Sequence, residues 1–231
     1  MFASKHNEAI SEAVASSLND NIKAYPALRY SFLTPYYDQL VQLFMPEKRI
    51  RQQLLEHCAL ADVSKVLDYG CGTGSMLYLI YKYHPETELV GFDPDPLILK
   101  QAITRLSNTK ARLEHSLTSS LQYGPFDRIV STWVFHHLTD PQKEEALTVI
   151  KNHLKKDGLF IIADWGKPAN WLMRICSFCV QLVDNFYTTS SNYGGKLPDF
   201  LKNAGFNIQR IEPGVNTAFG TLYFHICSKI A

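Results

Sequence analysis

The chain has 231 residues, a length that predicts one domain with a substantial core. Its 23 basic and 22 acidic residues nearly cancel to a formal net charge of +1, so it lacks the basic surplus with which proteins bind nucleic acid. Apolar residues make up 46% and aromatic residues 12% of the chain, which excludes intrinsic disorder.

The N-terminal part, residues 1–57, is expected to form a helical cap, with many apolar and aromatic side chains in residues 32–44. The first residues lack the continuous apolar core of a signal peptide. Five scattered cysteines do not suggest a disulfide framework, so we expect a cytoplasmic location. The longest apolar stretch, 171–183, is shorter than the roughly 20 apolar residues of a membrane span and is interrupted by polar residues.

From residue 65 onward, short apolar runs alternate with segments of helical periodicity. Helices are expected at residues 74–84 and after Pro94 or Pro96, since proline suits the first turn of a helix. The apolar runs predict strands at residues 65–70, 88–93, 111–115, 126–131 and 159–163. This alternation predicts an α/β fold in which a doubly wound parallel sheet is covered by helices on both faces.

A third helix is expected to begin at Asp140, as its N-cap, with Pro141 in the first helical position. Lys155 and Lys156 suit the last turn of this helix, and residues 157–158, Asp-Gly, would then turn the chain.

The end of the chain departs from the alternation. A helix is expected at residues 197–204, followed by two strands at 206–212 and 220–229 with no helix between them. These strands predict an antiparallel hairpin at one edge of the sheet. Residues 165–204 are expected to form a helical insertion, or lid, over the substrate site within the single domain 1–231.

The glycine-rich turn in residues 66–74, VLDYGCGTG, is the most informative stretch. Gly70, Gly72 and Gly74 remove Cβ atoms at a strand-to-helix turn, where the backbone must approach a ligand. Ligands of open parallel sheets bind at the carboxyl ends of the strands. The dinucleotide pattern G-x-G-x-x-G would place glycine at position 75, where this chain has Ser75.

Two carboxylates at strand ends indicate which ligand is bound. Asp68 would repel a pyrophosphate at the following helix N-terminus but would attract an ammonium group. S-adenosylmethionine carries an amino group and a sulfonium and has no phosphate. Asp93 ends the next strand, where an acidic residue hydrogen-bonds the ribose hydroxyls of a bound nucleoside. Together these residues predict S-adenosylmethionine as the cofactor.

With these motifs, the chain resembles the class I S-adenosylmethionine-dependent methyltransferases, in particular the small-molecule group that includes ubiquinone/menaquinone-biosynthesis methyltransferases. The resemblance extends over about residues 30–231 and rests on VLDYGCGTG at 66–74, VGFDP at 90–94, FDRIVSTWVFHHL at 126–138 and LKKDGLF at 154–160. It implies a Rossmann-like seven-stranded sheet in the order 3-2-1-4-5-7-6, with strand 7 antiparallel.

The resemblance also implies cofactor contacts by position. The glycine-rich turn and Asp68 would hold the methionine part, and the residues after the fourth strand would contact its amino-acid moiety. Many relatives have Gly-Asp-Ala after the third strand, where this chain has Ser116 and Leu117, so apolar and backbone contacts would serve the adenine. The cofactor-binding set is then Tyr37, Asp68, Gly70, Cys71, Gly72, Gly74, Asp93, Pro94, Ser116, Leu117, Ser131 and Thr132.

Candidate residues for the chemistry follow the fourth and fifth strands. His136 and His137 lie near the expected point of methyl transfer, where an imidazole can take a proton from the acceptor. The alternative is that both are structural histidines. Asp164 and Trp165 end the fifth strand and are candidates for substrate contact, as is Tyr30 in the cap; Asp164 would otherwise cap a turn.

Residues 171–186 show apolar side chains at helical spacing, which fits a helix packed under a cap, the wall of an apolar pocket, a homodimer face or a membrane-surface face. Cys176 and Cys179 within this run are interpreted as buried thiols, since no second ligand pair for zinc is present, and no metal is expected.

The sequence therefore predicts a methyltransferase acting on a small, largely apolar or aromatic acceptor that is uncharged or lipophilic. A nicotinamide-dependent oxidoreductase and a non-catalytic S-adenosylmethionine-binding module are the alternatives. No nucleic-acid partner and no stable membrane insertion are expected.

Overall fold

The computed structural model describes residues 46–115, 123–217 and 220–230. Most of the expected N-terminal cap, with Tyr30 and Tyr37, lies outside the described residues, as do Ser116 and Leu117. In helix α7, only the backbone is described for residues 179, 180 and 182–184.

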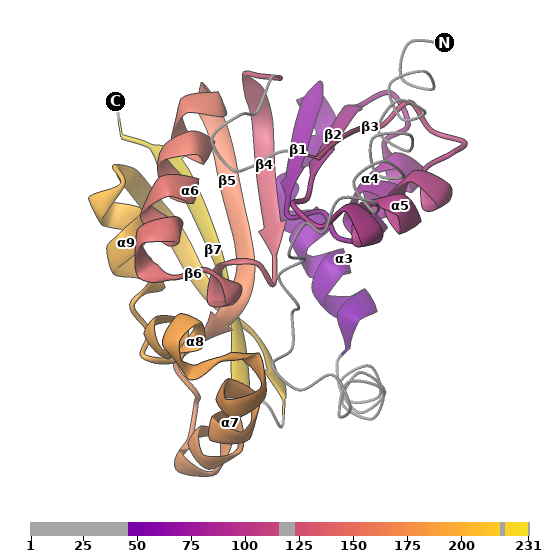
Figure 1. The fold of residues 1–231 in the computed structure, drawn as a ribbon. Helices are drawn as coiled ribbons and strands as arrows, with labels where there is room; N and C mark the ends of the chain where they lie inside the picture. Colours follow the sequence, from indigo (N-terminus) through magenta and orange to yellow (C-terminus); the bar gives the residue numbers. More distant parts are fainter. Residues whose placement is uncertain (1–45, 116–122, 218–219, 231) are drawn as a thin grey trace.

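A seven-stranded sheet forms the centre of the molecule, with the strand order β3-β2-β1-β4-β5-β7-β6 (Figure 1). Strand β7 runs antiparallel to both of its neighbours, while β1 to β5 pair in parallel. This arrangement confirms the predicted order and the antiparallel seventh strand. The strands are β1 (Lys65–Tyr69), β2 (Glu88–Phe92), β3 (Arg112–Glu114), β4 (Phe126–Thr132), β5 (Leu154–Gly166), β6 (Phe206–Thr217) and β7 (Gly220–Lys229).

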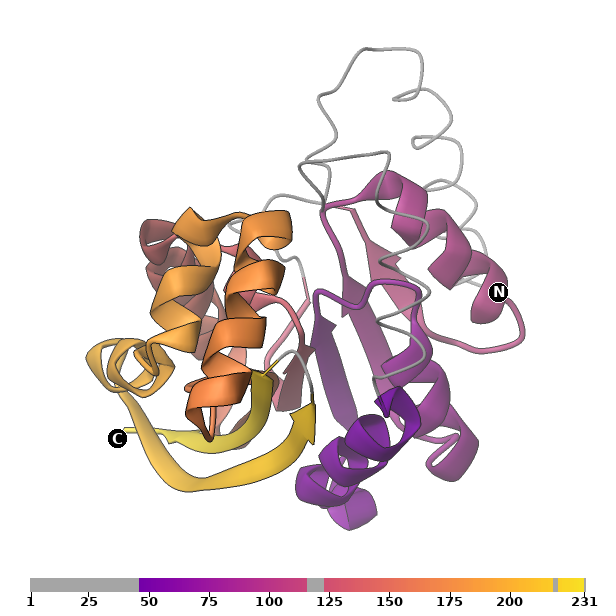
Figure 2. The same cartoon turned by 90° about the horizontal axis from the view of Figure 1, so that it is seen from below.

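Helices cover both faces of the sheet (Figures 1 and 2). On one face lie α3 (Glu47–Cys58), α4 (Ser75–Tyr83) and α5 (Pro96–Arg105); on the other lie α6 (Asp140–His153) and α9 (Leu197–Asn203). Short 3-10 helices, η1 (Leu60–Asp62) and η3 (Phe135–His137), precede β1 and follow β4.

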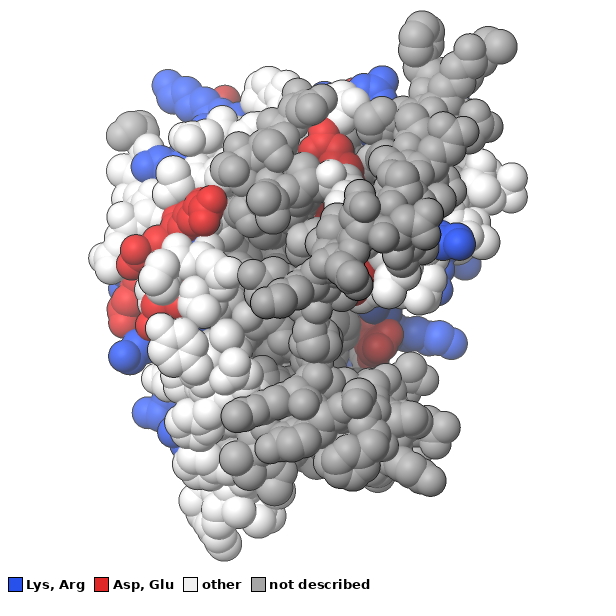
Figure 3. Space-filling view, in the orientation of Figure 1, with Lys and Arg blue, Asp and Glu red and all other residues white. Residues whose placement is uncertain are grey.

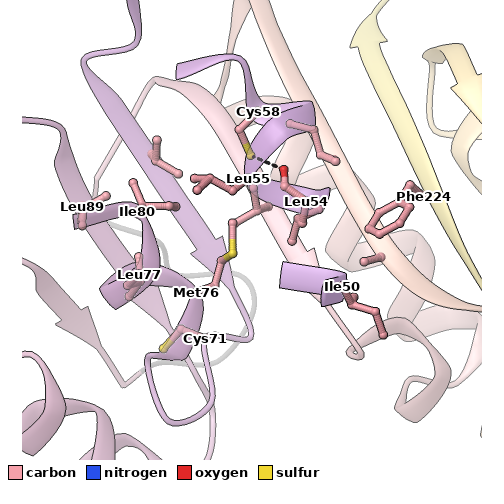
Figure 4. Packing of buried hydrophobic residues seen from close by; sticks show 14 of the residues in the cluster. Ile50, Leu54, Leu55, Cys58, Cys71, Met76, Leu77, Ile80, Leu89 and Phe224 are labelled. Atoms are coloured by element: carbon pink, nitrogen blue, oxygen red, sulfur yellow. Dashed lines mark hydrogen bonds between the residues drawn. The ribbon is translucent and has the colours of Figure 1, made fainter. Parts of the chain in front are cut away.

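The central strands are apolar on both faces because each face lies against a helical layer. Along β5, Ile161 and Ala163 pack with the first layer, while Phe160 and Ile162 pack with the second. Figure 4 shows the first layer, where side chains of α3 and α4 meet between the helices and the sheet. Near the end of α3, the Cys58 thiol donates a hydrogen bond to the carbonyl of Leu54 at 3.1 Å.

Two predicted helix boundaries are wrong. Helix α6 is capped by Thr139, not Asp140, because Thr139 and Gln142 form a reciprocal capping box and Asp140 is already helical. The helix also ends at His153, so Lys155 lies in β5 rather than in the last helical turn.

The expected turn at residues 157–158 is part of the long strand β5, with Lys156 before it. Leu154 already pairs with Phe126 of β4, and Leu159 pairs with Arg128. Residues 155–158 therefore stand opposite Asp127 alone and form a bulge within the strand. At the start of α5, Pro96 rather than Pro94 occupies the first turn, and Asp95 is the N-cap.

The segment after β5 forms two helices where one was expected, α7 (Trp171–Asp184) and α8 (Phe186–Tyr193). Asn185 breaks them with a φ of 81°, a conformation that asparagine tolerates, and its side chain accepts a hydrogen bond from the Tyr187 N–H at the start of α8. Both helices project beyond the carboxyl ends of β4 and β5 (Figure 1). In the described part of the chain, no helix is long and apolar enough to cross a membrane.

Candidate functional site

A cleft of about 1440 Å³ opens at the carboxyl ends of β1, β2 and β4, the edge of the sheet that Figure 2 views. The start of α3 and the corner between α7 and α8 complete its walls. Of the sequence-predicted site residues, the cleft brings together Asp68, Gly70, Cys71, Gly72, Asp93, Pro94, Thr132 and His137.

The glycine-rich turn connects β1 to α4 and has three glycines with positive φ: 77° at Gly70, 53° at Gly72 and 73° at Gly74. The N–H groups of Gly70 and Cys71 both donate to the carbonyl of Phe92, each at 2.8 Å, which fixes the turn against β2. The three glycines have different packing roles. A Cβ at Gly70 would lie 2.3 Å from Cγ2 of Val134, whereas a Cβ at Gly72 would meet, among the described residues, only Ile98, at 3.9 Å.

Gly74 faces the helical layer and does not line the cleft, because a Cβ there would lie 2.9 Å from a methyl of Leu106. Gly70 and Gly74 therefore permit close packing against neighbouring side chains. Gly72 leaves the backbone of the turn accessible from the cleft.

We expect Gly70→Ala to lower the free energy of unfolding by about 2–5 kcal/mol, because it adds both left-handed backbone strain and a clash with the stiff side chain of Val134. Gly72→Ala, the matched control, adds only the backbone strain, about 1–2 kcal/mol. Urea unfolding without ligand measures both values. Equal losses for the two variants would contradict this assignment of packing roles.

Asp68 places a carboxylate at the cleft, where it is only 2% exposed. Its Oδ1 atom has no hydrogen-bond partner among the described residues. Burial, opposed by the nearby Arg51 and reinforced by Asp93, raises the pKa of Asp68 to about 7. A buried, unpaired carboxylate is costly, and a cationic ligand group in the cleft would relieve that cost.

The Asp93 carboxylate accepts hydrogen bonds from two loops, the glycine-rich turn and the turn before α5. Its Oδ2 accepts a hydrogen bond from the Gly72 N–H at 2.8 Å, and its Oδ1 accepts one from the Asp95 N–H at 2.9 Å. Burial raises the pKa of Asp93, and these two hydrogen bonds partly offset the rise. Each carboxylate oxygen has a second lone pair, so Asp93 retains the capacity to accept hydrogen bonds from two ligand hydroxyls.

The end of β4 contributes neighbouring residues with different roles. Ser131 is fully buried and donates to the carbonyl of Tyr69 at 2.9 Å, so it joins β4 to β1 and does not line the cleft. Thr132 lines the cleft, and its hydroxyl is another buried group without a partner among the described residues.

Trp133, next in the chain, also lines the cleft and has a φ of 56°. That conformation is rare for a bulky residue and is often found at functional sites. The Arg51 guanidinium lies 5.6 Å from the centre of its ring.

The two adjacent histidines occupy different places. His137 lines the cleft, whereas His136 is buried behind it with Nδ1 2.7 Å from Oδ1 of Asp164. The two imidazole rings are in contact, with their centres 3.9 Å apart and their planes tilted by 42°. His136 therefore supports the ring of His137 and is not itself placed at the cleft wall.

Asp164 is fully buried and does not line the cleft, contrary to its expected place at the rim. Besides His136, its carboxylate accepts hydrogen bonds from the N–H groups of Phe135 and Trp165, each at 2.7 Å. Burial alone would raise the pKa of Asp164, but His136 and these bonds hold it below its usual value. Asp164 thus organises η3 instead of meeting a ligand.

His137 is neutral at physiological pH. Although part of its side chain opens onto the cleft, the protein around the ring and then the neighbouring His136 lower the pKa of His137 to about 3. A neutral imidazole can accept a hydrogen bond from a hydroxyl in the cleft.

Cys71 and Trp165 complete the sequence-predicted residues. Burial, together with Asp68 and Asp93, raises the pKa of the Cys71 thiol well above its usual value, so it is protonated and unreactive. Trp165 is buried and stacks on Tyr193 with ring centres 6.2 Å apart, away from the cleft. Across the described ranges, no cluster of His, Cys, Asp or Glu could hold a metal ion.

Sequence reasoning missed a group of cleft residues whose positions depend on the tertiary fold. Trp133 and Val134 lie in the motif at residues 126–138, but nothing in their residue types indicates that they line the cleft. The α7–α8 corner was expected near the site as a segment, without individual residues. The missed residues that matter most are Arg51, Trp133, Val134, Asn185, Tyr187 and Thr188.

Known proteins are similar to this chain in sequence and in fold. A family model described as a methyltransferase domain matches residues 66–158. An uncharacterized methyltransferase from Synechocystis is 30% identical over 166 residues, which are 71% of this chain and 76% of that protein. Another, from Anoxybacillus flavithermus, is 34% identical over 99 residues, and there the match spans about half of the relative, 46%.

A solved structure shares the fold at low sequence identity. The O-methyltransferase from a trans-AT polyketide synthase of Brevibacillus brevis, in complex with S-adenosyl-L-homocysteine, is 16% identical with a TM-score of 0.60. The match covers 86% of this chain and 78% of that one. The sequence matches and the fold agree with each other.

Proposed function

The chain belongs to the class I S-adenosylmethionine-dependent methyltransferases, and on that premise we propose that it methylates a small, largely apolar or aromatic acceptor bound in the cleft beside His137. Membership of this family excludes the nicotinamide-dependent oxidoreductase as its function. Likewise, it is an enzyme rather than a non-catalytic binding module.

The observation that carries the site assignment is the buried carboxylate of Asp68 at the cleft, whose Oδ1 has no hydrogen-bond partner among the described residues. We assign to it the ammonium group of the methionine part, because that cation would ionise Asp68 and remove the cost of its burial. Asp93 would accept hydrogen bonds from the ribose hydroxyls, and the open backbone at Gly72 leaves room for the cofactor between them.

The cofactor supplies an electrophilic methyl group on a positively charged sulfur. The protein therefore has to align the acceptor and exclude water. We propose that His137 orients a hydroxyl acceptor, since it lines the cleft as a neutral imidazole that can accept a hydrogen bond. With a pKa of about 3 it is too weak a base to hold the proton, which is released to solvent. The buried Asp164–His136 pair positions His137, because it fixes η3 and places the His136 ring against the His137 ring.

Apolar walls on this side of the cleft support the acceptor class. Val134 and Leu138 flank His137 in the sequence and line the cleft with it, and Met76 and Ile98 line it from the first helical layer. Two cationic side chains of the wall are engaged: Arg51 pairs with Glu47 at 2.6 Å, and Arg105 donates to Thr73 and Ser75. Lys48 and Arg49, at the start of α3, are exposed where they line the cleft. The acceptor class therefore rests on the apolar residues beside His137.

The test compares matched acceptors. Formation of S-adenosylhomocysteine is measured with uncharged alkylphenols or hydroquinones and with the same rings bearing a carboxylate, after calorimetry has established cofactor binding. We expect turnover with the uncharged members and little with the charged ones. Preference for the carboxylated rings would overturn the acceptor class while leaving the cofactor assignment intact.

His137→Gln is expected to lower kcat by about 100-fold for a hydroxyl acceptor, since a misplacement of the acceptor by about 1 Å can cost that much. Cofactor affinity should stay the same. Because the pKa of His137 is lowered, wild-type kcat should show no acid inflection near the usual histidine value of about 6.5. Stopped assays from pH 5 to 8 measure both effects, with His84→Gln, at the far end of α4, as the control. An unchanged kcat in His137→Gln would remove the histidine from the chemistry.

A further inference from the structure

Helices α7 and α8 expose an unusual number of large apolar side chains. Trp171 is 75% and Tyr187 71% exposed, and in α7 Trp171, Ile175 and Phe178 lie at i, i+4 and i+7 on one face. Phe178 and Phe186 stack across the two helices with ring centres 6.0 Å apart. We call this surface the apolar tip; it consists of Trp171, Leu172, Ile175, Phe178, Phe186 and Tyr187.

The described inner side of the same helices includes several polar residues. Ser177 is 0% and Gln181 1% exposed, and the Gln181 amide donates to the Ser177 hydroxyl at 3.4 Å. Helix α8 likewise buries Thr189 and Asn192. Among the described side chains, Met173 and Tyr193 are the buried apolar residues of the pair. A surface helix of a soluble protein normally buries its apolar face and exposes its polar one. Here large apolar side chains are exposed although polar ones are buried, so water is a poor environment for the outer face.

Basic residues flank the apolar tip. Residues 167–196 contain Lys167, Arg174 and Lys196 against a single acid, Asp184, although the whole chain is nearly neutral. Lys167 and Arg174 line a shallow hollow together with Trp171, and the Arg174 guanidinium lies 5.2 Å from the Phe178 ring centre. In Figure 3 the visible described atoms at the lower end are uncharged or basic. Exposed aromatics beside lysine and arginine suit the interface of an anionic bilayer.

The apolar tip borders the cleft. Asn185, Tyr187 and Thr188, at the corner between α7 and α8, line the cleft wall, and Tyr187 belongs to both surfaces. Figures 1 and 2 place the two helices at the carboxyl edge of the sheet, on which the cleft opens.

We propose that the apolar tip docks the enzyme on an anionic lipid bilayer, as a peripheral contact in which α7 and α8 lie in the interface. A bilayer fits better than a second copy of the chain. In a two-fold dimer through this patch, the basic residues of one copy would face those of the other, which is unfavourable. An anionic bilayer accepts both the aromatic side chains and the basic flank.

Docking would bring the cleft to the bilayer surface, so that a lipophilic acceptor could enter from the lipid past Tyr187. This step rests on the proposed function, whereas bilayer binding does not. Vesicle binding without cofactor therefore tests the docking, and cofactor calorimetry without vesicles tests the site, so that failure of one is distinguishable from failure of the other.

The experiment is vesicle flotation of the full chain with phosphatidylcholine alone and with equal parts of phosphatidylcholine and phosphatidylglycerol. We expect binding to the anionic vesicles that weakens as salt is raised. The double variant Trp171→Ser/Leu172→Ser should lose about tenfold or more in partition coefficient, since two side chains no longer enter the interface. Lys167→Gln and Lys196→Gln should each lose about fivefold, on anionic vesicles only.

Two controls carry the same chemical changes elsewhere. Tyr83→Ser removes an exposed aromatic of α4, and Lys110→Gln removes an exposed lysine before β3; neither should alter flotation. Absence of wild-type binding to the anionic vesicles would overturn the proposal. So would a stable dimer in light scattering that Trp171→Ser/Leu172→Ser converts to monomer, because the apolar tip would then be covered by a second copy.

Discussion

Asp68→Asn should abolish most cofactor binding while making the cofactor-free protein more stable at alkaline pH. Removing one partner of a buried charge pair costs about 3–5 kcal/mol, so affinity for S-adenosylmethionine should fall by at least about 100-fold. The reason is specific to this carboxylate, because its buried Oδ1 is left without a partner among the described residues. Isothermal calorimetry measures the loss directly.

The stability gain follows from the raised pKa. Asp68 has a pKa of about 7 in the folded protein against the usual 3.8, so the folded state binds the proton more tightly than the unfolded chain. Wild-type stability therefore falls as the pH rises between these two values. Because Asn carries no charge, the stability of Asp68→Asn does not fall with pH in this way. The difference in unfolding free energy between Asp68→Asn and wild type should grow by about 2–4 kcal/mol from pH 4 to pH 8.

The affinity for S-adenosylmethionine should also depend on the ionisation of Asp68, but in the opposite direction to stability. The ammonium group binds the ionised carboxylate, so wild-type affinity should rise about tenfold per pH unit below 7 and level off above it. At pH 6, binding should release close to one proton, which calorimetry in buffers of different ionisation enthalpy detects. Residual binding by Asp68→Asn should release none.

Asp127→Asn is the matched control, because Asp127 is a carboxylate at the opposite end of the sheet with the opposite shift. Hydrogen bonds from Lys155 and Ser64 outweigh its partial burial and lower its pKa, so its stabilising effect is present at neutral pH and is lost on acidification. The control should lose stability at pH 7 and bind the cofactor normally. Unimpaired cofactor binding by Asp68→Asn would contradict the central assignment of the site.

The sequence could predict Asp68 and the glycine-rich turn because local chemistry alone constrains them. A carboxylate and three glycines at a strand-to-helix turn leave few alternatives, and the sheet order followed from the resemblance. His136 and His137 show the limit of this reasoning. They are neighbours in the chain, and only the 3-10 geometry of η3 turns one toward Asp164 and the other toward the cleft.

Other parts of the site depend on contacts distant in sequence. Trp133 has a positive φ just after β4, and no residue pattern encodes it. Asn185 breaks an apolar run that has helical periodicity throughout, so the run predicted one helix. Asp164 looked like a rim residue because it ends a strand, yet backbone N–H groups from η3 enclose its carboxylate.

Lys143→Met should be strongly destabilising, and it should weaken acceptor binding as well. Lys143 is 0% exposed, and its ammonium donates to the carbonyls of Leu138 and Thr188, at 2.8 and 3.0 Å, and to the Ser191 hydroxyl at 2.7 Å. This one group therefore ties α6 and the end of η3 to α8. Nothing in the sequence distinguishes it from Lys151, the other lysine of α6.

Methionine preserves the length and volume of the side chain but leaves these acceptors without their donor. We expect a loss of about 3 kcal/mol in the free energy of unfolding, since each unsatisfied buried acceptor costs about 1 kcal/mol or more. Lys143→Arg should not restore stability, because its larger planar group does not fit a fully buried site built for an ammonium. Lys156→Met, at an exposed position of β5, is the control and should change stability little.

Binding measurements on Lys143→Met can tell whether Lys143 positions α8 at the cleft or stabilises the whole fold. Leu138 and Thr188 line the cleft, and both are held by the ammonium of Lys143. At a temperature where the variant is folded, KM for the acceptor should rise while the Kd for S-adenosylmethionine stays unchanged, because Asp68 and Asp93 lie on β1 and β2, away from this anchor. Equal losses in both constants would show that Lys143 supports the whole fold rather than the position of α8.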